Sequence, residues 1–176
     1  MRFVPLGIPG AYLVEIEPRA DERGAFARTF CAREFAEHGL DGRLVQASLS
    51  TNARRGTVRG LHWQAEPHAE AKLVRCVRGR IYDLLVDVRP DSHIFRQHLA
   101  VELDAEARNA VYLPPGVAHG FLTLEDDCEV HYAMSEFHAP EAARGARWDD
   151  PAFGIVLPEP VAVISERDRS WPDFEF

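Results

Sequence analysis

The fold class is decided by residues 72–88, which read KLVRCVRGRIYDLLVDV. They predict two strands, Lys72 to Val77 and Arg80 to Val88, joined at Arg78-Gly79. The second strand alternates the apolar Tyr82, Leu84, Val86 and Val88 with the polar Asp83, Asp87 and Arg89. A period of two is typical of a half-buried strand, with one face in the core and the other in solvent. Antiparallel β structure is therefore expected here.

Short segments of the same kind recur along the chain at a spacing of roughly ten residues. Further strands are expected at residues 12–17, 25–30, 43–50, 58–64, 98–103, 110–113 and 128–134. One short helix is expected from Ala32 to His38, with Phe35 buried and Gly39 as its stop. The pattern predicts an all-β fold, an antiparallel sandwich or barrel with little helix, but it does not select the strand order.

The length and charge of the chain narrow the class of protein. Its 176 residues suit one domain, which we expect to span residues 1–176. The formal net charge of −8 argues against general binding to nucleic acid or to a membrane surface. Cys31, Cys76 and Cys128 cannot all pair within one chain, and no secretory or CxxC pattern accompanies them. We therefore expect reduced thiols and a cytoplasmic location.

The stretch Val58-Arg59-Gly60-Leu61-His62-Trp63-Gln64 concentrates polar groups in an otherwise strand-forming segment. Arginine forms a fork for phosphate or carboxylate, and histidine is suited to proton transfer near neutral pH. On a regular strand Gly60 and His62 share one face and Arg59 faces the opposite side. If Arg59 and His62 serve one ligand, a bulge or bend is expected near Gly60.

Several candidate residues have two interpretations when the sequence is considered alone. His62 is either a proton-transfer group or a structural histidine, and His119 is either a ligand contact or a loop anchor. Tyr132 is expected on the inward face of its strand, where it serves as core or as a proton donor. Asp168 resembles a solvated charge. A metal site built from His62, His68, His119 and His131 is a further hypothesis, although no HxH or HxxxH pair supports it.

Eight short motifs occur in order along the chain. They are Asp21-Glu22-Arg23-Gly24-x-Phe26, Val45-Gln46, Arg59-Gly60-Leu61-His62-x-Gln64, Lys72-Leu73-Val74-Arg75-Cys76-Val77-x-Gly79, Pro115-Gly116-x-Ala118-His119-Gly120-Phe121, Tyr132, Trp148-x-Asp150-Pro151 and Ser165-x-Arg167-Asp168. Each motif is weak, but the ordered set is specific. The chain resembles the dTDP-4-dehydrorhamnose 3,5-epimerase family, from about residue 2 to residue 172.

The resemblance implies a jelly-roll, cupin-like barrel with a few short helices, a homodimer, no metal and no redox cofactor. It implies an isomerase acting on a dTDP-linked 4-keto-6-deoxy sugar. His62 matches the general base, Asp168 its acidic partner, Tyr132 the acid on the opposite face of the ring, and Lys72 a cation near the 4-keto oxygen. The substrate-binding positions that the resemblance implies are Arg23, Phe26, Gln46, Ser48, Arg59, Lys72, His119 and Arg167.

The chain departs from the family pattern at five positions. These are Arg28 and Ala143, where the family usually has Glu, Ser48 for Asn, Ala133 for Lys, and His138 for Tyr. The catalytic set is intact, so the departures concern contacts with the sugar and the nucleotide. The alternatives to a 3,5-epimerase are a single-site epimerase, a relative that acts on another nucleotide sugar, a metal-dependent cupin dioxygenase and a non-catalytic sugar-binding protein.

Overall fold

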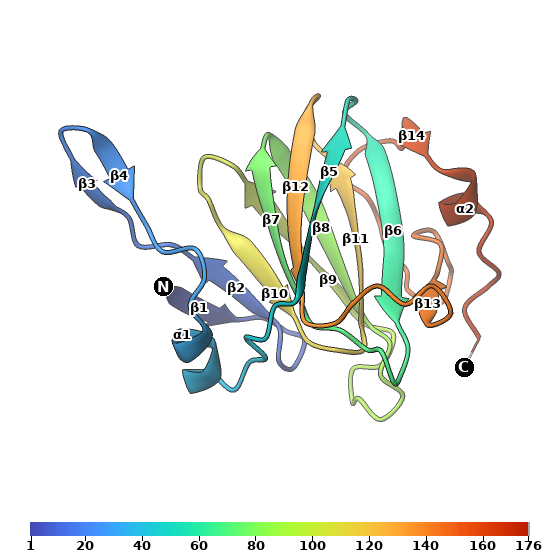
Figure 1. Ribbon diagram of the computed structural model, residues 1–176. Coiled ribbons are helices and arrows are strands. Elements are labelled where there is room, and N and C mark those ends of the chain that lie inside the picture. The colour runs from blue at the N-terminus through green and yellow to red at the C-terminus, as the bar shows by residue number, and fades with distance from the viewer. Residues whose placement is uncertain (176) are drawn as a thin grey trace.

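The computed structural model describes residues 1–175, and this part of the chain forms two facing β-sheets with a projecting hairpin (Figure 1). The first sheet has the order β1 (Arg2–Pro5), β2 (Tyr12–Glu15), β10 (Ala110–Leu113), β7 (Lys72–Arg78), β12 (Cys128–Met134) and β5 (Gln46–Asn52). The second has the order β13 (Ala143–Gly145), β6 (Thr57–Gln64), β11 (Val117–Thr123), β8 (Arg80–Asp87) and β9 (His98–Asp104).

The remaining elements lie outside these two rows. Strand β14 (Val163–Ile164) pairs in parallel with β6, while β3 (Arg19–Asp21) and β4 (Gly24–Phe26) form the separate hairpin. The two short helices are α1 (Ala32–Glu37) and α2 (Glu166–Arg169). No helix in residues 1–175 is long and apolar enough to cross a membrane.

The strands β5 to β12 make a jelly roll. Four of them, β5, β12, β7 and β10, lie in the first sheet, and β6, β11, β8 and β9 lie in the second, with antiparallel pairing throughout. The predicted strands at 72–77 and 80–88 therefore belong to different sheets and do not pair with each other. Gly79 makes the corner between them with a φ of +74°, and a Cβ there would lie 2.7 Å from Cys128 Sγ. The all-β, antiparallel jelly-roll prediction is confirmed.

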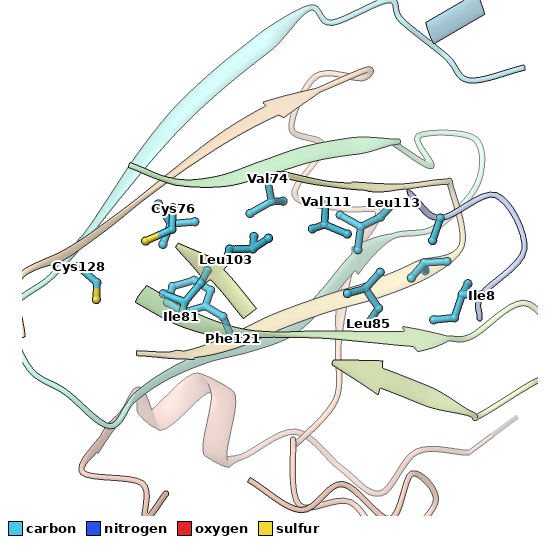
Figure 2. Close-up of a cluster of buried hydrophobic side chains, with 13 residues drawn as sticks. Ile8, Val74, Cys76, Ile81, Leu85, Leu103, Val111, Leu113, Phe121 and Cys128 are labelled. Carbon is cyan, nitrogen blue, oxygen red and sulfur yellow. The ribbon is translucent and has the colours of Figure 1, made fainter. Parts of the chain in front are cut away.

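The main core fills the space between the two sheets, as Figure 2 shows. Its buried members include Val74, Cys76, Ile81, Leu85, Leu103, Val111, Phe121 and Val130. Tyr132 packs against this cluster, so its predicted inward orientation is confirmed. The sandwich therefore buries a continuous apolar interior and leaves a polar cavity at one end of it.

The outer face of the second sheet is covered at β8, and this corrects the interpretation of that strand. Its apolar residues Leu84 and Val86 point outward, where Phe153 and Ile155 of the C-terminal segment cover them. The alternate face of the strand turns Asp83 and Asp87 inward, and both are fully buried. The half-buried prediction was wrong because alternation locates two faces but cannot show that a distant segment covers one of them.

Local predictions were mostly confirmed, with shifted boundaries. Phe35 is the buried residue of α1, and Gly39 follows the helix with a φ of +71°. The strand expected at 25–30 ends at Phe26, and the strand expected at 43–50 runs from Gln46 to Asn52. Helix α2 was not predicted, although Ser165 gives a local signal because its Oγ accepts a hydrogen bond from the Asp168 N–H at 3.1 Å.

Candidate functional site

A β-bulge in β6 brings Arg59 and His62 to the same cavity. His62 pairs with His119 of β11, whereas Arg59 pairs with Phe121, so three steps along β6 match two along β11. The extra residue rotates the strand and turns both side chains inward. The bend expected near Gly60 is therefore confirmed.

Gly60 allows this bulge because its backbone is left-handed and tightly packed. Its φ is +101°, and a Cβ would lie 2.5 Å from the His119 carbonyl oxygen and 2.7 Å from the Gly120 Cα. The space left by the missing side chain is thus filled by the neighbouring strand. A larger residue would push β6 away from β11 and move His62.

The inner cavity, which we call the reaction chamber, has a volume of about 240 Å³. Both sheets contribute to its wall, and the lining residues are Ser50, Arg59, His62, Lys72, His119, Tyr132 and Asp168. Six of the seven are among the residues predicted from the sequence, and Ser50 is the addition. His62 lies on β6 of one sheet and Tyr132 on β12 of the other, so an imidazole and a phenol face the same space from opposite sheets.

His62 and Asp168 form a hydrogen-bonded pair although they are 106 positions apart. His62 Nε2 lies 2.6 Å from Asp168 Oδ1, and the Gly60 N–H donates to Oδ2 at 3.3 Å. Burial raises the pKa of Asp168, but the hydrogen bonds from His62, Gly60 and Ser165 outweigh it and hold the pKa below its usual range. Asp168 therefore remains a carboxylate that fixes the orientation of the His62 imidazole.

Tyr132 is held in its phenol form. Burial raises the pKa of Tyr132 far above its usual value, the charge of Asp83 raises it further, and Arg59 opposes the rise. The ring meets His119 edge to face at 5.6 Å between centroids. A phenol that stays protonated is suited to donate a proton rather than to accept one.

Lys72 supplies positive charge between the two walls. Its Nζ donates to the His62 carbonyl oxygen at 3.1 Å and lies 2.9 Å from Glu70 Oε1. Glu70 is almost fully buried, and its Oε2 has no hydrogen-bond partner in residues 1–175. These contacts fix the ammonium group where an oxyanion would develop.

A second cavity, the outer cavity, adjoins the reaction chamber and measures about 350 Å³. The two share His62, Lys72 and Tyr132. The further lining residues are Gln46, Ser48, Trp63, Gln64, Glu70, Met134, Glu136, His138, Ala143, Arg144 and Arg167. Three predicted contacts, Gln46, Ser48 and Arg167, therefore lie here, together with His138 and Ala143, which depart from the family pattern.

The loop that carries His138 is tied to this cavity by two glutamines. Gln64 donates to the carbonyls of His68 and Phe137 and accepts from the Ala139 N–H at 2.7 Å. Gln46 accepts from the His138 N–H at 2.9 Å. These bonds give both side chains a structural role in shaping the cavity.

Two predicted contacts, Arg23 and Phe26, line neither cavity. They lie on the β3–β4 hairpin, which projects from the sheets (Figure 1). Within residues 1–175, Arg23 forms its side-chain hydrogen bonds with Asp21. Phe26 is 80% exposed and lines a separate hollow with Arg28. Arg28 forms an ion pair with Glu34 at 2.8 Å.

Several lining residues were missed by the sequence analysis. Ser50 had a usable signal, because it lies two positions from Ser48 on the same strand and so shares a face with it. Glu70 lies just before β7, outside the strand. Arg144 had no such signal, since it lies in the unremarkable segment Ala143-Arg144-Gly145. Its place in the outer cavity depends on the pairing of β13 with β6.

The histidines do not gather around a common point. His62 and His119 each direct Nε2 at a carboxylate, Asp168 and Asp83, at 2.6 and 2.7 Å. Within residues 1–175, no group of three or more His, Cys, Asp or Glu side chains could hold a metal ion. The set considered for a metal-dependent dioxygenase is therefore not formed by these residues.

Comparisons with known proteins agree on one family. The family model described as dTDP-4-dehydrorhamnose 3,5-epimerase matches residues 5–175. A protein of that name from Methanothermobacter thermautotrophicus is 43% identical over 97% of this chain and 92% of its own. A dTDP-4-dehydrorhamnose 3-epimerase from Streptomyces niveus is 39% identical over 96% of this chain and 82% of its own. The crystal structure of the 3,5-epimerase from Elizabethkingia anophelis superposes with a TM-score of 0.95 at 35% identity, covering 99% of this chain and 96% of its own.

Proposed function

The chain belongs to the dTDP-4-dehydrorhamnose 3,5-epimerase family of carbohydrate isomerases, and we propose that it inverts C3 and C5 of a dTDP-linked 4-keto-6-deoxy sugar in the reaction chamber. One observation carries this assignment. His62 and Tyr132 face a single cavity from opposite sheets, with Lys72 between them. That is the arrangement required to remove a proton from one face of a sugar ring and to return a proton to the other.

The proposed reaction exploits the acidity that a 4-ketone gives to the hydrogens on C3 and C5. His62, oriented by Asp168, takes one of these protons, and the electron pair moves onto the 4-keto oxygen as an enolate. The Lys72 ammonium stabilises this oxyanion. Tyr132 then delivers its proton to the same carbon from the opposite face, which inverts the centre. Proton exchange with solvent resets His62 and Tyr132 before the second centre reacts.

The two cavities divide the substrate between them. The reaction chamber, at about 240 Å³, suits the hexose ring and contains the proposed acid and base. The outer cavity suits the diphosphate and nucleoside, because Arg144 and Arg167 offer guanidinium groups and Trp63 and Met134 offer apolar surface. Binding energy from the nucleotide would thus orient the ring between His62 and Tyr132.

The direct test is solvent isotope exchange. Purified protein is incubated with dTDP-4-keto-6-deoxyglucose in deuterated buffer, and deuterium at C3 and C5 is followed by NMR. The proposal expects incorporation at both carbons. Exchange at C3 alone would assign a single-site epimerase, the activity for which the Streptomyces niveus relative is named. Ligand-induced stabilisation without exchange at either carbon would instead indicate a sugar-binding protein.

We further propose that the protein is a homodimer in which each β3–β4 hairpin covers the outer cavity of the partner. Two features support this. The hairpin is exposed along its whole length and carries Arg23 and Phe26, which line neither the reaction chamber nor the outer cavity of their own subunit. Leu49 and Val77 leave large apolar side chains exposed on the first sheet. Light scattering after size exclusion is expected to give twice the monomer mass. The Leu49→Glu variant is expected to have the mass of a single monomer.

The remaining assignments follow from the same chemistry. We infer that residues 1–176 act as one catalytic domain, since strands from both ends of the chain extend the two sheets around a shared core. A cytoplasmic location is consistent with Cys76 and Cys128, which are free thiols on neighbouring strands. Fractionation of cells that express the tagged protein tests the location.

A further inference from the structure

The reaction chamber contains a second histidine–carboxylate pair that the proposed reaction does not use. His119 Nε2 lies 2.7 Å from Asp83 Oδ2, and both side chains are at least 95% buried. His119 lies directly opposite His62 on the paired strands β11 and β6. Two imidazoles, each with a carboxylate at Nε2, therefore stand side by side on one wall.

The two carboxylates differ in how they are stabilised. Asp168 accepts from His62 and also from the Gly60 N–H. In the described part of the chain, Asp83 hydrogen-bonds only to His119, and its Oδ1 has no partner; the residue is 0% exposed. An isolated buried carboxylate is strongly disfavoured unless an adjacent positive charge or a proton neutralises it.

The surroundings of the second pair therefore favour the retention of a proton. Burial raises the pKa of Asp83, and the nearby His119 and Lys72 only oppose that rise, whereas the pKa of Asp168 is lowered. If the retained proton lies on His119, Nε2–H bonds to the Asp83 carboxylate and Nδ1 also carries hydrogen. If it lies on Asp83, the carboxylic acid donates to Nε2, and Nδ1 again carries hydrogen. Either placement makes Nδ1 a hydrogen-bond donor.

We propose that Asp83 is a positioning residue that keeps His119 Nδ1–H as a donor to the 4-keto oxygen while the enolate forms. His119 would then act beside Lys72 in the reaction chamber, where both residues line the wall. The two pairs have opposite tasks, since His62–Asp168 accepts a proton and Asp83–His119 holds one. Environments that push neighbouring groups in opposite directions are a general mark of separate acid and base roles. This inference rests on the proposed epimerase function.

The test is Asp83→Asn, with Asp87→Asn as a matched control. Asp87 is also fully buried on the inward face of β8, but it bonds to Arg89 and Ser92 and lines neither cavity. We expect Asp83→Asn to lower kcat about 10- to 100-fold with KM within about twofold, as for loss of one oxyanion donor. We expect Asp87→Asn to lower the Tm and to leave kcat unchanged.

Each outcome supports or contradicts the proposed role of Asp83 in positioning His119. Wild-type kcat in Asp83→Asn, or an equal kcat loss in Asp87→Asn, would overturn the inference, as would a change in KM alone. If Asp83→Asn does not fold, His119→Asn is measured instead, and retained kcat in that variant overturns it equally. Absence of isotope exchange in the wild-type protein would refute the epimerase assignment itself, which is a different result from normal exchange in both variants.

Discussion

The reaction chamber and the β3–β4 hairpin both contain residues predicted to contact substrate, and they differ in how those residues are supported. In the chamber His62, Lys72 and His119 each have a bonded partner within 3.1 Å. On the hairpin, Arg23 hydrogen-bonds to Asp21, two positions earlier, and Phe26 is 80% exposed. The chamber is preorganised by contacts between distant parts of the chain, whereas the hairpin residues are held mainly by their own turn.

This difference separates two kinds of effect. Groups that are already fixed by the fold can stabilise the transition state without further ordering, so their loss is expected to appear in kcat. Groups that become ordered only on binding contribute to substrate affinity, so their loss is expected to appear in KM. Substitutions in the two regions therefore test the comparison directly.

The largest effect is expected for His62→Asn. Removing the proposed base should lower kcat by about 10³-fold, within the range for general base catalysis, and should abolish isotope exchange. The Tm should change little because His62 is partly exposed, with 43% of its side chain accessible. His93→Asn, which changes an exposed histidine outside both cavities, is the control. Exchange at the wild-type rate in His62→Asn would show that another group is the base.

Gly60→Ala should have the next largest effect, because it disrupts the β-bulge that orients the His62 side chain. The added Cβ would lie 2.5 Å from the His119 carbonyl oxygen, and the alanine would have to adopt an unfavourable positive φ. We expect a loss of about 1–3 kcal/mol in stability from strain and a fall of about 100-fold in kcat/KM from misplacement. Calorimetry and initial-rate assays measure both.

The control for Gly60→Ala is Gly154→Ala. Gly154 also has a positive φ, +62°, but a Cβ there would meet nothing within 4 Å. It should lose some stability and keep its activity. An equal loss of activity in both variants would mean that strain alone, rather than the position of His62, explains the result.

The contrast between the regions also explains what the sequence could predict. The bulge at Gly60 and the inward face of Tyr132 follow from local rules, since alternation along a strand fixes which side chains share a face. The contact between His62 and Asp168 does not, because it joins positions 106 residues apart. Only the resemblance to a family pointed to that pair.

Asp83 illustrates the opposite failure. Its alternation with apolar residues predicted a solvent-facing side chain, yet it is buried beside His119. Periodicity reports polarity and not location, and the C-terminal segment that covers the other face of β8 begins more than 60 residues later. The hairpin shows the same limit, since neither alternation nor spacing predicts that Arg23 and Phe26 lie away from both cavities.

A smaller effect is expected for Arg23→Ala and Phe26→Ala on the hairpin. Each should raise KM by about tenfold, near 1.4 kcal/mol, with kcat and Tm almost unchanged. Glu22→Ala, between the same strands, should have no effect. A drop in kcat without a change in KM would show that the hairpin orders the chamber, and the distinction between the two regions would fail.

The smallest effect concerns the pH dependence of stability, and it compares one carboxylate from each region. The pKa of Asp168 is lowered in the folded protein because bonds from His62, Gly60 and Ser165 outweigh the effect of burial. A lowered pKa gives stability that is complete above the unfolded pKa and is lost as pH falls through the folded pKa. Asp168→Asn should therefore lower the free energy of unfolding at neutral pH by an amount on the order of 1 kcal/mol, which appears as a lower Tm. In acid the variant should match the wild type.

Asp21 on the hairpin provides the counterpart. Its pKa is also lowered, mainly by the side-chain hydrogen bond from Arg23, but both side chains are exposed to solvent. Solvent and salt screen such a pair, so Asp21→Asn should show the wild-type Tm at every pH. Thermal unfolding from about pH 3 to pH 8 checks both variants. If Asp21→Asn lost as much stability as Asp168→Asn, the hairpin would be held by the fold as firmly as the chamber, and its residues would need no partner to be ordered.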